Sequence, residues 1–183
     1  MDYGSTHREI IERCKRGDRQ AQFELYRLYS KAMYNVCIRM VKSDLDAEDL
    51  LQNSFVDVFT KLDTFRYQSS IGAWIKRIVI NNCINFLKKR RLYMEELQDH
   101  HVGVAEEEDD GPSFGLSVQE VQFALDQLPD GYRVVFSLYL LEGYDHKEIS
   151  DILNISEATS KSQYSRAKRK LKEILLSKSL NSN

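Results

Sequence analysis

The strongest constraint on the fold is the segment 95–117, which has no lysine or arginine and carries eight acidic residues. Five of them form the uninterrupted block Glu106–Asp110, and glycine and proline follow closely. Because like charges repel one another and glycine and proline interrupt regular structure, this composition predicts a flexible linker. We therefore expect two small domains, residues 1–94 and 118–183, joined by an acidic linker over residues 95–117.

Both flanking parts carry the apolar spacing of helices, and no segment alternates with the period of a strand. In the first part we expect helices that start at the cap Asp18, at Ser43 or Asp44, and at Ile71. In the second part the expected helices are 117–127, 131–141, 146–153 and a long one from the cap Ser156 to about Leu176. The fold class is therefore all-α, with an N-terminal helical bundle and a C-terminal four-helix domain.

The net charge of −2 hides a strong segregation of charge along the chain. Residues 1–94 hold 17 basic and 11 acidic groups, and residues 161–178 hold seven basic groups and one acidic group. Two basic surfaces separated by an acidic tether are typical of a protein that binds nucleic acid.

The composition also argues against several other classes of protein. No run approaches the roughly 20 apolar residues of a membrane span, and the N-terminus has no signal-peptide pattern, so we expect a cytoplasmic protein. The spacing of Cys14, Cys37 and Cys83 matches no metal motif, so we expect buried, reduced thiols and neither a metal nor a cofactor.

The sharpest local pattern is a short helix, a three-residue turn and a longer basic helix over 145–175, which predicts a helix-turn-helix motif. At 100° per residue, the inward face of the long helix carries Tyr164, Ala167, Leu171 and Ile174. The outward face is small, hydroxylic and basic, which suits close approach to DNA. Its candidate DNA-binding residues are Ser156 at the cap, Thr159, Ser162, Arg166 and Arg169, together with Lys161 and Gln163, which flank the face. The alternative is a solvated basic helix on an ordinary bundle.

Two blocks of this chain resemble the sigma-70 family of RNA polymerase sigma factors. The segments 147–153, 155–162 and 166–171 look like the family's second DNA-binding domain. The segments 46–52 and 65–81 look like its first domain. Two blocks in the right order, with no further domain, resemble the small two-domain ECF (extracytoplasmic function) subgroup.

The resemblance implies that the helix after Ser43 docks on the clamp helices of the polymerase β′ subunit. The residues implied in polymerase binding are Asp46, Glu48, Asp49, Gln52 and Phe55. Stabilisation of the helix dipole is the alternative reason for acidic residues in this first turn.

The resemblance also implies a surface that binds and opens the downstream promoter element. Its implied residues are Phe65, Tyr67, Lys76, Arg77, Asn81, Lys88, Arg90 and Arg91. Asn81 matches the family position that reads a flipped base, whereas Trp74 is more typical of a core residue. The acidic linker would thread toward the polymerase channels that hold nucleic acid, or serve only as a spacer.

The chain departs from the family pattern in its long last helix. It has Ala158 where glycine is usual, Ser160 where an apolar residue is common, and Gln163 where many members have arginine. We expect Ser160 to point inward and loosen the packing slightly. Gln163 would favour adenine where arginine favours guanine. In the alternative, Ser162 and Arg166 contact the bases and Gln163 packs against the preceding helix.

The expected function is promoter-specific initiation with core RNA polymerase, without catalysis or a small-molecule substrate. The implied partners are promoter DNA, the β′ clamp helices and the β flap, and an anti-sigma factor is a further possible partner. The main alternative is a stand-alone helix-turn-helix regulator, for which no dimerisation zipper is present. A metal-dependent hydrolase is disfavoured because Asp46, Glu48 and Asp49 lack paired histidine ligands.

Overall fold

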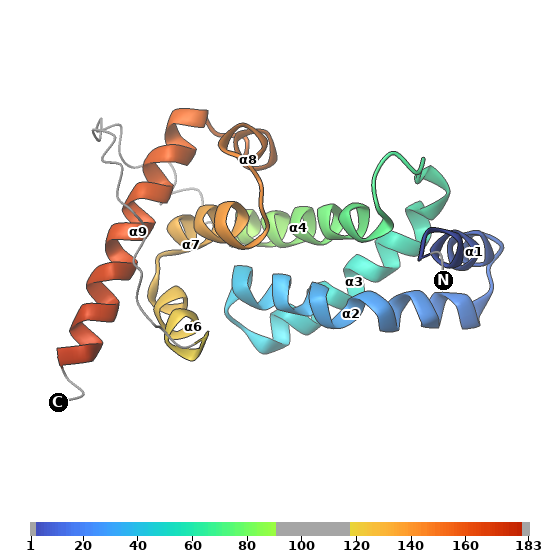
Figure 1. The fold of residues 1–183 in the computed structure, drawn as a ribbon, viewed down its shortest axis with the longest axis horizontal. Helices are drawn as coiled ribbons and strands as arrows, with labels where there is room; N and C mark the ends of the chain where they lie inside the picture. The colour runs from blue at the N-terminus through green and yellow to red at the C-terminus, as the bar shows by residue number, and fades with distance from the viewer. Residues whose placement is uncertain (1–2, 91–117, 181–183) are drawn as a thin grey trace. The chain divides into compact units, whose positions relative to one another are not determined.

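The structure is a computed structural model that describes residues 3–90 and 118–180, and every regular element in these ranges is helical (Figure 1). The elements before the gap are α1 (Tyr3–Lys15), α2 (Arg19–Val41), α3 (Asp44–Lys61), the 3-10 turn η1 (Leu62–Thr64) and α4 (Ile71–Lys89). Those after it are α6 (Val118–Gln127), α7 (Asp130–Phe136), the π-helical turn η2 (Ser137–Leu141), α8 (His146–Leu153) and α9 (Glu157–Leu180). The predicted all-α fold is confirmed.

Backbone contacts divide the chain into two compact units, Met1–Phe86 and Leu87–Asn183, which we call the first and the second unit. The division falls in the last turn of α4, a few residues before the boundary expected from charge. The predicted acidic linker, residues 95–117, lies outside the described residues. Among the helices that are described, none is long and apolar enough to cross a membrane.

Capping side chains start the helices where the sequence predicts. In α2, Asp18 Oδ1 accepts hydrogen bonds from the amides of Gln20 and Ala21 at 2.9 and 3.2 Å. The Ala21 amide and the Arg13 guanidinium lower the pKa of Asp18 below its usual value. Ser43 caps α3, and Asp145 and Glu148 form a reciprocal capping box at the start of α8.

Helix α1 is an element that the sequence analysis did not predict. Its chain continues into α2 through Gly17, whose φ of 81° is readily adopted only by glycine. The guanidinium of Arg13 in α1 lies 2.8 Å from Asp18, the residue that caps α2. Helix α1 also contacts α2 and η1, so it is packed against the rest of the first unit.

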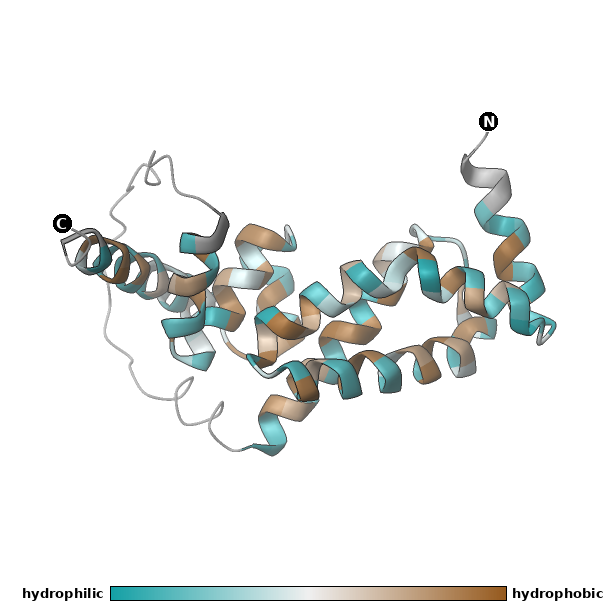
Figure 2. Cartoon of the chain, turned by 90° about the horizontal axis from the view of Figure 1, so that it is seen from below, coloured by the Kyte–Doolittle hydropathy of each residue, from teal (hydrophilic) through white to brown (hydrophobic). Residues whose placement is uncertain are grey.

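The core of the first unit comes from the apolar stripes of α2, α3 and α4, and Figure 2 shows brown and teal residues alternating along these helices. The stripe Leu51, Phe55 and Val58 on α3, continued by Leu62 in η1, is buried, as its spacing predicts. The three cysteines are buried thiols, which is also as predicted. The neighbouring Cys37 thiol and burial raise the pKa of Cys83 well above its ordinary value, which disfavours the reactive thiolate.

The second unit has a smaller core, in which α9 lies across α6 and α7. Its central buried residues are Ala124, Leu125, Leu128, Phe136, Ala167 and Leu171. Tyr164 and Ile174 pack against this cluster, as expected for the inward face of α9. The predicted single helix from 131 to 141 is instead α7 followed by the π-helical turn η2.

Candidate nucleic-acid and protein interfaces

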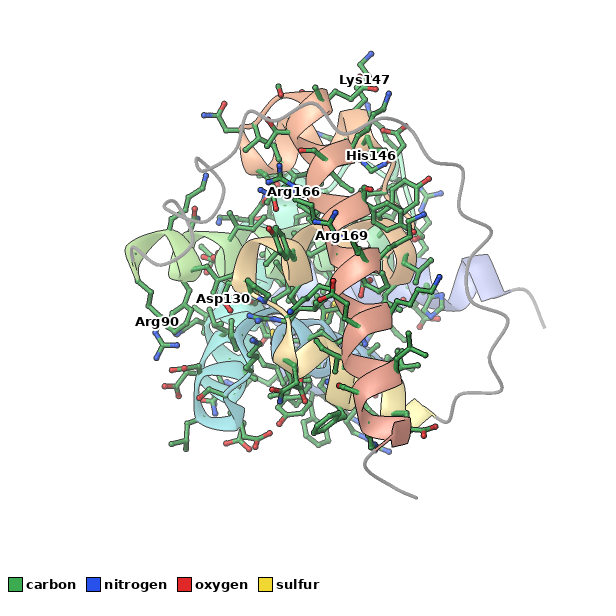
Figure 3. All side chains as sticks on the ribbon, turned by 90° about the vertical axis from the view of Figure 1, so that its left-hand side faces the viewer. Arg90, Asp130, His146, Lys147, Arg166 and Arg169 are labelled. Atoms are coloured by element: carbon green, nitrogen blue, oxygen red, sulfur yellow. The ribbon has the colours of Figure 1, made fainter. Side chains whose placement is uncertain are left out.

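The face of α9 that points away from the core is small and basic. Lys161 and Arg169 are exposed, and Ser162 and Arg166 are half-buried. Figure 3 shows Arg166 and Arg169 on the middle of α9, and His146 and Lys147 at the start of α8. Spacings of four, three and four along 158, 162, 165 and 169 place these positions on one face of the helix. The arrangement offers cations to phosphates and small groups that leave room for a DNA backbone.

The first turn of α9 is closed by the predicted cap. Ser156 Oγ accepts a hydrogen bond from the Thr159 amide at 2.9 Å and lies 2.7 Å from Thr159 Oγ1. Glu157 lies 3.1 Å from the ammonium of Lys161. The cap and the ion pair are both exposed, so the N-terminal end of α9 is accessible. The positive end of the helix dipole lies there and favours a phosphate.

Gln163 does not lie on the outward face, and this corrects the sequence-based assignment. Its side chain is 2 % exposed, and it shares the buried stripe of α9 with Ser160, Ala167 and Leu171. Spacings of three, four and four put these residues on the side of α9 that packs against the rest of the second unit. The structure therefore favours the alternative in which Gln163 packs inside and does not read a base.

Ser160 is buried as predicted, but it forms a specific contact where looser packing was expected. Its Oγ lies 2.9 Å from Nδ1 of His146, so one polar contact joins the two helices of the helix-turn-helix. The His146 ring stacks on Tyr139 at 4.4 Å, and Tyr164 closes the cluster. Burial, and then Lys161, lowers the pKa of His146. The pair fixes how α8 meets α9 and therefore how α9 is presented.

The exposed face of α3 combines carboxylates, an amide and two large apolar side chains. Glu48, Asp49 and Gln52 are exposed, and Asp46 is half-buried. Leu45 and Val56, which the sequence analysis did not single out, are 78 % and 64 % exposed. We define the docking face of α3 as Leu45, Glu48, Asp49, Gln52 and Val56, whose helical spacing puts them on one side. Exposed apolar residues beside charges are typical of a protein interface.

Phe55 does not belong to this face, which is a second correction. It is 3 % exposed, and its ring lies 4.8 Å from the ring of Tyr26 and 6.0 Å from that of Phe59. The buried stripe of α3 already predicts this position, because Phe55 is four residues from Leu51 and three from Val58. Its role is in the core of the first unit.

Helix α4 carries a polar stripe opposite its buried side. Arg77, Asn81 and Asn85 are exposed at four-residue spacing, and Lys88 continues the stripe half-buried. Asn85 was not predicted, although this spacing could have revealed it. Lys76 is half-buried, Arg90 is exposed beyond the end of α4, and the predicted residue Arg91 lies outside the described residues.

The neighbouring Asn82 has a different role from Asn81. Its Nδ2 donates hydrogen bonds to Ser54 Oγ at 3.1 Å and to Asp57 Oδ2 at 3.0 Å. Asn82 lowers the pKa of Asp57 through this contact. Asn82 therefore ties α4 to α3, and Asn81 is left exposed on the polar stripe.

Phe65 is buried, which is a third correction, because a stacking platform for bases must be accessible. It is 4 % exposed, and its ring lies 5.4 Å from that of the half-buried Trp74. Tyr67, two residues later, is 39 % exposed, but its hydroxyl donates a hydrogen bond to Glu12 of α1. Of the predicted aromatic pair, Tyr67 alone is accessible, and it is held by α1.

Comparison with known proteins gives a consistent result over both units. Residues 25–93 match the family described as Sigma-70 region 2, and residues 118–171 match Sigma-70, region 4. The chain is 30 % identical over 152 residues to the ECF RNA polymerase sigma factor SigM of Bacillus subtilis (strain 168), covering 82 % of this chain and 93 % of that protein. It is 29 % identical over 177 residues to SigW of the same strain, covering 90 % and 94 %.

Two solved structures of similar fold also match the chain. The sigma factor RpoE from Bartonella quintana, solved in complex with the anti-sigma factor NepR, matches with a TM-score of 0.56 and 27 % identity over 83 % of this chain and 94 % of that one. The structure of CnrH with the cytosolic domain of CnrY matches with the same TM-score at 22 % identity, over 93 % and 97 %.

Proposed function

The chain belongs to the ECF subgroup of the sigma-70 family of RNA polymerase sigma factors, and from this premise we propose a binding partner for each of its exposed helix faces. The first unit, within a domain of residues 1–94, docks on core polymerase and holds the downstream promoter element. The domain 118–183 reads the upstream element through α9. The observation that carries the proposal is that each matched region has its own exposed, chemically suited helix face.

The docking face of α3 is proposed to bind the β′ clamp helices of core polymerase. Leu45 and Val56 supply apolar area at its two ends, and Asp49 and Gln52 supply polar contacts between them. Apolar anchors combined with polar contacts are the usual composition of a protein interface. Asp46 and Glu48 add negative charge at the start of the helix, where the dipole favours it.

The polar stripe of α4 is proposed to meet the downstream element. Asn81 has both an amide donor and an acceptor, which suits the edge of an exposed base. Arg77 and Lys88 lie on the same stripe and suit phosphates, and Lys76 and Arg90 are proposed to extend this contact. The segment 65–70 precedes α4, and we propose that it meets the opened DNA strand of the same element.

The outward face of α9 is proposed to enter the major groove of the upstream element. Lys161, Arg166 and Arg169 mainly neutralise phosphates, and Ser162 and Arg166 are the candidates for base contacts. Ser156 and Thr159 lie at the helix start, where amide groups favour a phosphate. Contact of this domain with the β flap, and binding of an anti-sigma factor, remain proposals from the family.

The proposed activity is binding, so it requires no catalytic residue, cofactor or small-molecule substrate. It is expected in the cytoplasm, where polymerase and chromosomal DNA meet. A stand-alone regulator is disfavoured because it would leave the docking face of α3 without a partner.

Run-off transcription from a random promoter library, with core polymerase alone and with the chain added, tests the proposal. We expect a distinct subset of promoters to depend on the chain. Equal output from every promoter in the two reactions would contradict it. The double variant Asp49→Ala/Gln52→Ala should bind core polymerase more weakly with unchanged helicity, because both residues are exposed. Parental binding of this variant would remove α3 from the interface.

A further inference from the structure

Three side chains of α1 converge on Tyr67 in the segment between η1 and α4. Glu12 accepts a hydrogen bond from the Tyr67 hydroxyl. The Arg8 guanidinium carbon and the Lys15 ammonium lie 5.2 and 5.0 Å from the centroid of its ring. Arg8, Glu12 and Lys15 recur at i, i+4 and i+7, so they occupy one face of α1. Helix α1 therefore contacts Tyr67 through one hydrogen bond and two cation–π contacts.

The backbone of Tyr67 is held in a conformation that a bulky residue rarely adopts. Its φ is 58°, in the left-handed region that costs energy for any residue with a Cβ atom. Such a conformation persists only where the surroundings determine it. Here the Tyr67 ring also lies 4.8 Å from the ring of the buried Phe65, so it is held from both sides.

The ionisation states suit the contact at neutral pH. Burial, and then the hydrogen bond to Glu12, raises the pKa of Tyr67 to about 12, so the phenol keeps its proton. The same hydrogen bond, and then Lys15, lowers the pKa of Glu12. The ammonium of Lys15 lies 3.3 Å from the Glu12 oxygen that accepts this bond. The carboxylate is thus charged and oriented toward Tyr67.

We propose that α1, through Glu12 and Tyr67, sets the conformation of segment 65–70 and thereby how well the chain captures the opened strand of the downstream element. The proposal rests on the proposed function, which places this segment at that strand. Tyr67 is then a positioning residue, because its hydroxyl is directed at Glu12. Helix α1 lies before the matched residues 25–93 and Tyr67 lies within them, so the contact joins the matched region to a helix that precedes it.

The test uses Tyr67→Phe, which keeps the ring and removes the hydroxyl, and Glu12→Gln, which keeps the shape and removes the charge. Tyr34→Phe is the matched control, because the Tyr34 hydroxyl donates to Asp44 at 2.8 Å in the same unit. The parent chain, these three variants and the double variant Glu12→Gln/Tyr67→Phe should all bind core polymerase with the same affinity.

The first measurement is hydrogen exchange, in the whole chain, of the amides of Phe65, Ala73 and Trp74, which donate the hydrogen bonds at the two ends of the segment. A net hydrogen bond corresponds to roughly threefold to tenfold in an opening equilibrium, so we expect Tyr67→Phe to speed exchange by about that factor. Tyr34→Phe should leave it unchanged. Parental exchange in Tyr67→Phe would overturn the proposal, whatever the function of the chain.

The second measurement is the affinity of the holoenzyme for a premelted promoter fragment selected with the parent chain. We expect Tyr67→Phe to lower it about threefold to tenfold, and Glu12→Gln to lower it by no more than this, because the amide oxygen still accepts a hydrogen bond. The double variant should lower it no further than Tyr67→Phe, because both changes act on one contact. Parental affinity, or additive losses, would overturn the proposal. Failure of the parent to bind core polymerase would instead overturn the proposed function, and the exchange result would still decide whether α1 orders the segment.

Discussion

The two units differ in where they keep their polar side chains. Among the described residues of the first unit, the buried polar side chain is Ser54, and the functional candidates lie outside. In the second unit Arg133, Ser137, Ser160 and Gln163 are buried. Arg133 lies 2.6 Å from Asp130 and donates to the Leu128 carbonyl at 3.3 Å. The second unit thus builds part of its interior from polar contacts.

This difference has a physical consequence for how each unit responds to change. Apolar packing is non-directional and tolerates small shifts, whereas a buried polar group costs free energy as soon as its partner moves. The first unit should therefore depend mainly on side-chain volume. The second unit should depend on the identity and protonation of individual polar groups, above all those that join α8 to α9.

The largest expected effect is on the apolar core of the first unit. Phe55→Ala removes a buried ring and should lower the free energy of unfolding by about 3–5 kcal/mol. Val56→Ala, one residue later on the exposed side, should change it by no more than about 0.5 kcal/mol. Trp74 is the single tryptophan, so its fluorescence during urea unfolding reports the first unit. Equal losses in the two variants would contradict the assignment of Phe55 to the core.

The next effect tests the buried position of Gln163. Gln163→Arg places a charge on the inward face of α9 and should destabilise the second unit by about 2 kcal/mol. Ser165→Arg, on the outward face, is the matched control and should be near neutral. Hydrogen exchange of the α9 amides measures both. A stable Gln163→Arg chain with a changed upstream preference would restore Gln163 to the reading face.

A smaller effect is expected at the contact between α8 and α9. Ser160→Ala leaves the ring nitrogen of the half-buried His146 without this partner and should cost about 1 kcal/mol in the second unit. Ser165→Ala, on the outward face of α9, is the matched control. Unchanged exchange in α9 would mean that apolar packing alone holds the two helices together.

The smallest effect is a pH dependence confined to the second unit. Burial lowers the pKa of His146, Lys161 lowers it further, and Glu157 and Asp145 act in the opposite direction. The unfolded chain then binds the proton more tightly, so this stability is present above the ordinary pKa of 6.5 and is lost as the pH falls below it. We expect the protection of the α9 amides, taken relative to the intrinsic exchange rate at each pH, to fall in that range, and His146→Gln to remove the dependence. A parental pH profile in His146→Gln would exclude His146 as the cause.

Local sequence signals predicted most helix starts, because a cap acts within three residues of itself. Asp18, Ser43, Asp145 and Ser156 each accept a hydrogen bond from the first turn that follows them. The outward and basic character of Lys161 and Arg169 also followed from helical spacing. Helix α1 was missed, and its place depends on contacts with α2 and η1 that are distant in sequence.

Sequence by itself determined the all-α class, the helix caps, the segregation of charge and the family to which the chain belongs. Helical spacing predicted the buried stripe of α3 and the inward face of α9, and the tertiary structure decided the burial of individual positions beside these faces. Phe65 is buried, Gln163 turns inward, and Tyr67 is held by α1, although the family resemblance or the helical spacing made all three candidates for binding. The physical reason is range: capping and charge act over a few residues, whereas burial depends on which distant helices pack against a face.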